Sequence, residues 1–60
     1  MDSKKLKIIM YDCIERATEN MEYWKREQRE DWLLKVNHYE SLVYAYKNVL
    51  SLIEEENKLN

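Results

Sequence analysis

The chain has 60 residues, a net charge of −2, one cysteine and one histidine, and it contains neither glycine nor proline. This length allows one domain, residues 1–60. One cysteine cannot form an internal disulfide, and one cysteine with one histidine supplies too few ligands for a Cys/His zinc site. We therefore expect no metal or cofactor. Because glycine and proline punctuate tight turns, their absence favours an all-α fold over a strand-rich one.

The N-terminal segment lacks the features of a targeting signal. Lys4, Lys5 and Lys7 precede a run of only four apolar residues, which Asp12 ends. A secretory signal needs a longer apolar core, and no run in the chain approaches the length of a transmembrane helix. We therefore expect a cytoplasmic protein without membrane contact, in which Cys13 stays reduced.

A first amphipathic helix is predicted over about residues 3–28. Ser3 is expected to cap its N-terminus, because a serine hydroxyl accepts a hydrogen bond from a free backbone N–H of the first turn. The apolar residues of this segment recur mostly at intervals of three and four, which places them on one helix face. This face comprises Leu6, Met10, Cys13, Ile14, Ala17, Met21 and Trp24.

A second helix, over about residues 31–58, carries the most regular pattern in the chain. Its apolar residues alternate spacings of four and three, which is typical of a helix-packing face. This face comprises Trp32, Val36, Tyr39, Val43, Tyr46, Leu50 and Ile53, widened by Leu42 and Val49. The polar stretch 25–31 separates the two patterns, and the heptad phase slips by one residue across it, as a turn would require. Asp31 is positioned to cap the second helix.

The distribution of charge favours an antiparallel hairpin. Three lysines lie near the start of the chain, and Glu54, Glu55 and Glu56 lie near its end. An antiparallel arrangement makes these clusters neighbours and puts the bend near residue 30, although each exposed ion pair is worth less than ~1 kcal/mol.

Two alternatives to this turn stay open at the level of sequence. Asn37, through a capping box with Glu40 or as the left-handed residue that ends the first helix, would move the turn to residues 35–38. A single unbroken helix in a parallel coiled coil is also compatible with the polar stretch, because Lys, Arg, Glu and Gln favour helix. The wide aromatic face suits a bundle better than a two-stranded coil.

The predicted second helix carries another apolar pattern, called here the second series, rotated by roughly 120° from the first. It runs through Leu34, His38, Ser41, Ala45, Asn48, Leu52 and Leu59. A hairpin needs only one apolar face per helix, so we expect this series to meet another helix, either in a second copy of the chain or in a different protein. The expected interface comprises Leu34, His38, Ala45, Leu52, Leu59 and Tyr44, and two hairpins packed together would complete a four-helix bundle.

No catalytic set of residues is visible in the sequence. Carboxylates such as Asp12 and Glu15 share a helix face, but catalytic carboxylates need a concave site, which two helices do not provide. Cys13 follows an acidic residue, which disfavours a reactive thiolate, and His38 has no companion metal ligand. We therefore expect a protein that is not an enzyme.

Basic and aromatic residues near the predicted turn support a second functional hypothesis. This basic cluster comprises Lys25, Arg26, Arg29 and Lys35, with Trp24 and Trp32 nearby. Such side chains can hold phosphates and stack bases, but the acidic residues 22, 27, 30 and 31 offset their charge.

The leading prediction is a small protein–protein interaction module, a regulator or inhibitor similar in composition to those of bacteria and phages, that presents helix surface to a partner. The alternative is a nucleic-acid-binding hairpin dimer.

Overall fold

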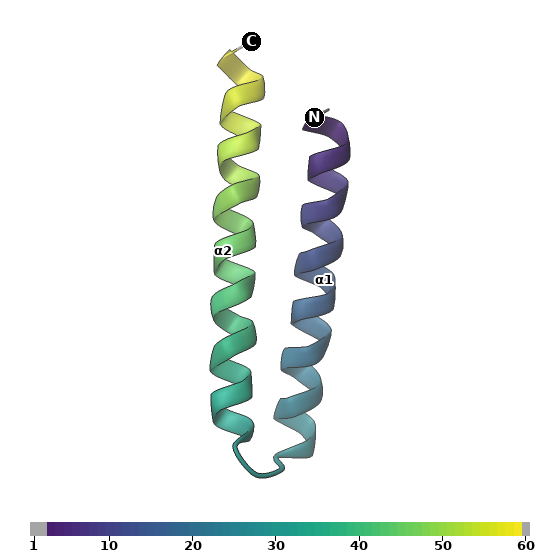
Figure 1. Cartoon of the computed structure of the whole chain (residues 1–60), viewed down its shortest axis with the longest axis vertical. Helices are drawn as coiled ribbons and strands as arrows, with labels where there is room; N and C mark the ends of the chain where they lie inside the picture. The colour runs from purple at the N-terminus through teal and green to yellow at the C-terminus, as the bar shows by residue number, and fades with distance from the viewer. Residues whose placement is uncertain (1–2, 60) are drawn as a thin grey trace.

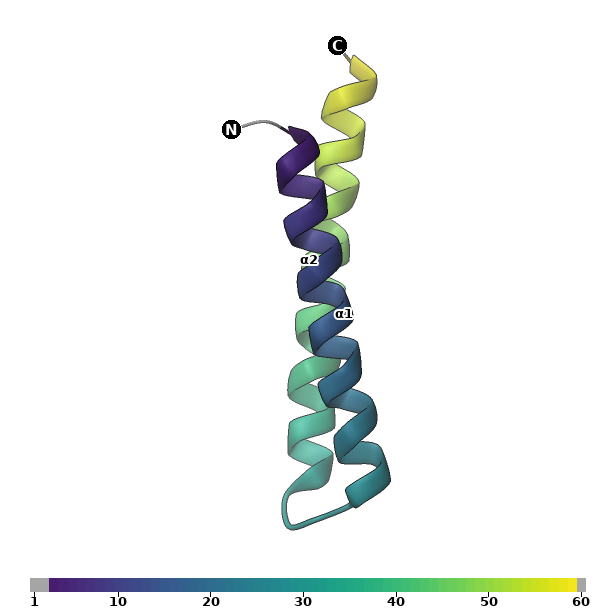
Figure 2. The ribbon, with the colours of Figure 1, turned by 90° about the vertical axis from the view of Figure 1, so that its right-hand side faces the viewer.

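The computed structural model describes residues 3–59, except for the side chains of Asn57 and Leu59. It contains helix α1 (Ser3–Glu27) and helix α2 (Trp32–Leu59), joined by residues 28–31. The helices run antiparallel, so the start of α1 and the end of α2 lie at one end of a rod and the turn lies at the other (Figure 1). They cross at a shallow angle, and the rod measures 47 × 15 × 14 Å (Figure 2).

The predicted all-α hairpin is confirmed, and each helix boundary lies within one residue of its predicted position. The two alternatives are wrong, because α2 runs without interruption through residues 35–38 and the polar stretch does contain the turn. The lysines of the first turns of α1 and the glutamates of the last turns of α2 lie at the same end of the rod, as the antiparallel prediction required (Figure 1).

Helix α1 ends on a residue in the left-handed conformation. Gln28 has a φ of 47°, and its N–H donates a hydrogen bond to the Trp24 carbonyl at 3.0 Å. This single bond, from the residue after the helix back to the last turn, is the αL cap that glycine usually provides. The chain therefore turns without glycine by placing a glutamine in a conformation that its Cβ disfavours.

Helix α2 begins after a second left-handed residue. Asp31 has a φ of 62°, and its carbonyl accepts the Lys35 N–H at 3.1 Å, so it occupies the N-cap position that the sequence predicted. Aspartate tolerates the left-handed region better than most residues. Within the described residues its carboxylate makes no hydrogen bond to the first turn of α2, so the cap consists of the backbone bond alone.

The helices bury one stripe each. Among the residues whose side chains the structure describes, the buried apolar ones are Ala17, Val36 and Ile53, with 5%, 6% and 7% of their surface exposed. The other members of the two predicted packing faces are half-buried, except Val49, which is exposed. Two helices can cover a side chain from one direction only, so no described side chain is fully enclosed.

Candidate interaction surfaces

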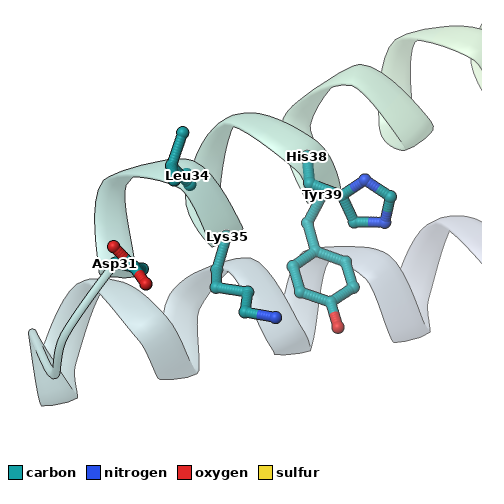
Figure 3. A pocket seen from close by; sticks show the side chains of 5 residues that line it. All are labelled: Asp31, Leu34, Lys35, His38 and Tyr39. Carbon is teal, nitrogen blue, oxygen red and sulfur yellow. The ribbon is translucent and has the colours of Figure 1, made fainter.

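The second series lies on the outer side of α2. Leu34 and Leu52 keep 68% and 64% of their surface exposed, and His38, Ala45 and Tyr44 are also exposed. Figure 3 shows the Leu34 side chain pointing away from α1, whereas those of Lys35 and Tyr39 reach toward it. The side chain of Leu59, the remaining residue of the predicted interface, lies outside the described part of the chain.

The two exposed leucines of the second series share one helix face. Leu34 and Leu52 are eighteen residues apart, which is five full turns of an α-helix or ~27 Å along its axis. Ala45 lies between them and leaves space for a neighbouring side chain. Tyr44 lies on the adjacent arc of the helix, four residues before Asn48, and so borders the series.

A hollow between the helices marks one of the two broad sides of the hairpin. It is lined by Cys13, Arg16, Ala17 and Asn20 from α1 and by Tyr39, Leu42 and Tyr46 from α2. A second hollow, nearer the turn, is lined by Asp31, Leu34, Lys35, His38 and Tyr39 (Figure 3). Both hollows lie on the same broad side, because Lys35 and Leu42, which line one hollow each, are seven residues apart and so share one side of α2. We call this side the groove face.

The groove face did not emerge as a separate surface from the sequence pattern. The signal that could have revealed it was the widening of the second packing face by Leu42 and Val49, seven residues apart, together with Cys13 beside the first. These residues flank the main packing positions on one side only. A flank that is apolar on both helices is typical of a hairpin side that packs against further helices.

The structure does not gather the basic cluster into one positive surface. The Lys35 Nζ atom lies 5.7 Å from the centroid of the Trp24 ring, and the Tyr23 ring meets the same tryptophan edge-on at 5.5 Å. Trp24 is therefore already engaged within the protein. Arg29 pairs with Glu27, with 3.4 Å between Nη2 and Oε1.

The remaining basic residues point in other directions. Lys25 and Arg26 follow Trp24 directly, and each step along a helix rotates a side chain by about 100°. They therefore leave α1 on different sides from the Trp24 ring. Trp32, like Trp24, is half-buried in the packing face.

The carboxylates and the cysteine considered as candidate catalytic groups do not come together in one site. Asp12 forms an exposed ion pair with Arg16, with 3.1 Å between Oδ2 and Nε, rather than a pair with a second carboxylate. Cys13 is a half-buried free thiol at the edge of the hollow. Over residues 3–59, side chains that bind metals do not form a cluster of three or more, and neither helix combines the length and apolarity needed to cross a bilayer.

Comparison of the chain with protein-family models, with curated proteins and with solved structures finds no match.

Proposed function

We propose that this protein is a non-catalytic protein–protein interaction module, a small regulator or inhibitor, which presents the second series to a helix of a partner protein. The observation that supports this proposal is the exposure of Leu34 and Leu52 on a face that the hairpin does not use for its own packing. The two leucines lie on one line along the helix with Ala45 between them, so a single partner helix can contact all three.

The stripe has the dimensions and composition of a helix-docking site. Its ~27 Å length matches five turns of a partner helix, which would contact it through residues spaced three and four apart. Full burial of a leucine side chain stabilises an interface by ~1.5–3 kcal/mol relative to leaving it in water. His38, Ser41 and Asn48 can hydrogen-bond around the two leucines, as the polar rim of an interface does.

The proposal is tested by affinity capture from a lysate of the source organism. The bait is the whole chain, either unchanged or carrying Leu34→Glu and Leu52→Glu together. Both leucines are exposed, so these substitutions leave the hairpin packing intact, and circular dichroism should show unchanged helix content. We expect one protein to be retained by the unchanged chain and lost from the double variant.

A matched control is available on the other helix. Ile8 keeps 67% of its surface exposed and faces away from α2, so Ile8→Glu adds the same charge at similar exposure but off the second series. It should retain the partner. Equal capture by all three baits would contradict the proposal. Retention that nuclease removes, and that charge reversal at Lys25, Arg26 and Arg29 abolishes, would support the nucleic-acid alternative instead.

A further inference from the structure

The groove face carries apolar surface of its own, outside the second series. Leu42 lines the hollow between the helices, and Val49, seven residues later on the same side of α2, keeps 40% of its surface exposed. On α1, the exposed Ile9 lies four residues before Cys13 and extends the apolar surface toward the chain ends. Arg16, the charged residue that lines the hollow between the helices, pairs with Asp12 of its own helix.

The accessible area of the hairpin exceeds that of a compact monomer. The protein exposes 4995 Å², whereas a folded monomer of 7.5 kDa exposes about 4,250 Å². The excess of roughly 750 Å² results from the rod shape, which leaves surface that a partner can cover; a standard protein–protein interface takes about 800 Å² from each partner. The broad side of a rod measuring 47 × 15 Å has a plan area of about 700 Å², the same order.

When a second copy packs antiparallel on the groove face, residues of α2 in one copy face complementary residues of α2 in the other. The middle of α2 lies between Ala45 and Tyr46. A two-fold axis level with this point, perpendicular to the helices and lying between the two facing groove faces, places Leu42 opposite Val49 of the second copy and the reverse. It also places Lys35, near the turn, opposite Glu56, near the chain end of the second copy.

In this register Leu42 faces Val49 and Lys35 faces Glu56. The two-fold axis repeats each pair, so apolar side chains meet apolar ones and opposite charges meet at four positions along α2. Shifting one copy by seven residues breaks the match, because it would place Lys35 opposite Val49 or Leu42 opposite Glu56. A two-fold interface requires such self-complementarity, and antiparallel packing gives every helix antiparallel neighbours.

We infer that the groove face binds a second copy of this chain, packed antiparallel, so that two hairpins form a four-helix bundle. This inference goes beyond the proposed function because the groove face centres on Leu42 and Val49 and not on the second series. Leu34 and His38 lie where the two surfaces meet, and Leu52 lines neither hollow, so it stays available to a partner. The single cysteine, Cys13, can be used to test this antiparallel packing. Cys13 lines the hollow together with Tyr46, so it lies level with the two-fold axis, and the two copies of Cys13 become neighbours on adjacent α1 helices.

The first test measures the oligomeric state by sedimentation equilibrium over a hundredfold range of concentration. We expect a dimer, and we expect Val49→Glu to raise the dissociation constant at least about tenfold by burying an unpaired charge. The matched control is Leu33→Glu, because Leu33 is 58% exposed on the opposite broad side. A folded monomer at every concentration, or equal weakening by both variants, would overturn the inference.

A charge-exchange experiment distinguishes a weakened interface from an unfolded variant. Lys35→Glu alone and Glu56→Lys alone should each weaken the dimer, whereas the two together should restore it, because the pair across the interface is re-formed with its signs reversed. Failure of the double variant to recover, while circular dichroism shows it to be helical, would overturn the proposed register.

Crosslinking locates the axis. A short bis-maleimide should join two copies through Cys13, since adjacent helices pack 8–10 Å apart. The control carries Cys13→Ser with Thr18→Cys, which moves the thiol to the other broad side of α1, and it should give little crosslinked product. More crosslinking through position 18 than through position 13 would place the interface on the broad side opposite the groove face and overturn the inference.

Val49→Glu leaves the residues of the second series unchanged, so loss of the dimer can be distinguished from loss of the partner protein.

Discussion

At the scale of the residue, Gln28 shows how a chain without glycine makes a sharp turn. Its φ of 47° lies in the region where Cβ crowds the backbone, at a cost of roughly 1–2 kcal/mol. The hydrogen bond from its N–H to the Trp24 carbonyl offsets part of this cost by satisfying one of the last free carbonyls of α1. The turn is therefore a site where the sequence is not optimal for stability.

Gln28→Gly should therefore stabilise the hairpin by about 0.5–1 kcal/mol, because glycine adopts the left-handed conformation without a Cβ clash, although it loses more entropy on folding. In a chain of this size, each kcal/mol corresponds to a rise of about 4–8 °C in Tm, which thermal denaturation followed by circular dichroism can measure. Gln28→Ala keeps the Cβ and should melt close to the unchanged protein. A glycine variant that melts at or below the unchanged protein would contradict the strain at this position.

At the scale of the element, Ala17 sets how closely the helices approach. It has the lowest exposure of the buried apolar residues described, 5%, and it lines the hollow beside Leu42 of α2. A methyl group at this point lets the backbone of α1 come near α2 while bulkier residues pack above and below it. The packing of the two helices is thus sensitive to volume at position 17.

Ala17→Leu should destabilise the hairpin by about 1–3 kcal/mol, since the added atoms must push the helices apart or adopt strained rotamers. Urea denaturation measures the change in the free energy of unfolding. Ala45→Leu is the matched control, because Ala45 lies near the middle of α2 but is exposed, and it should change stability by less than about 0.5 kcal/mol. Equal effects at the two positions would show that position 17 is not a tight contact.

Much of the element-level structure was predictable from the sequence. The three-and-four spacing predicts both helices and the face each one buries, and the polar stretch predicts the turn between Glu27 and Trp32. The left-handed conformations of Gln28 and Asp31 were not predictable, because neither residue type requires them. The groove face was indicated only by the widening of the packing faces at Leu42, Val49 and Cys13, and its hollows depend on how far each helix is rotated about its axis when the two pack.

At the scale of the whole molecule, the hairpin is a rod and not a globule. Its radius of gyration is 14.0 Å, whereas a compact domain of this length has about 10 Å. Chains of about 60 residues bury only about 60% of the surface that their unfolded state exposes, less than larger domains do, and a single cysteine cannot compensate with an internal disulfide. Association along the length of the rod would bury further apolar surface, and the dimer proposed above would link folding to the presence of a second chain.

Stability should consequently rise with protein concentration. If the groove face binds a second copy, folding and association are coupled, and mass action raises Tm as the chain is concentrated. Melting curves over a hundredfold range of concentration should shift to higher temperature for the unchanged protein and for Leu33→Glu, but not for Val49→Glu. A Tm that is independent of concentration in the unchanged protein would mean that the single hairpin is stable alone, with the groove face exposed to water. The buried stripe through Ala17, Val36 and Ile53 would then have to hold the two helices together without further help.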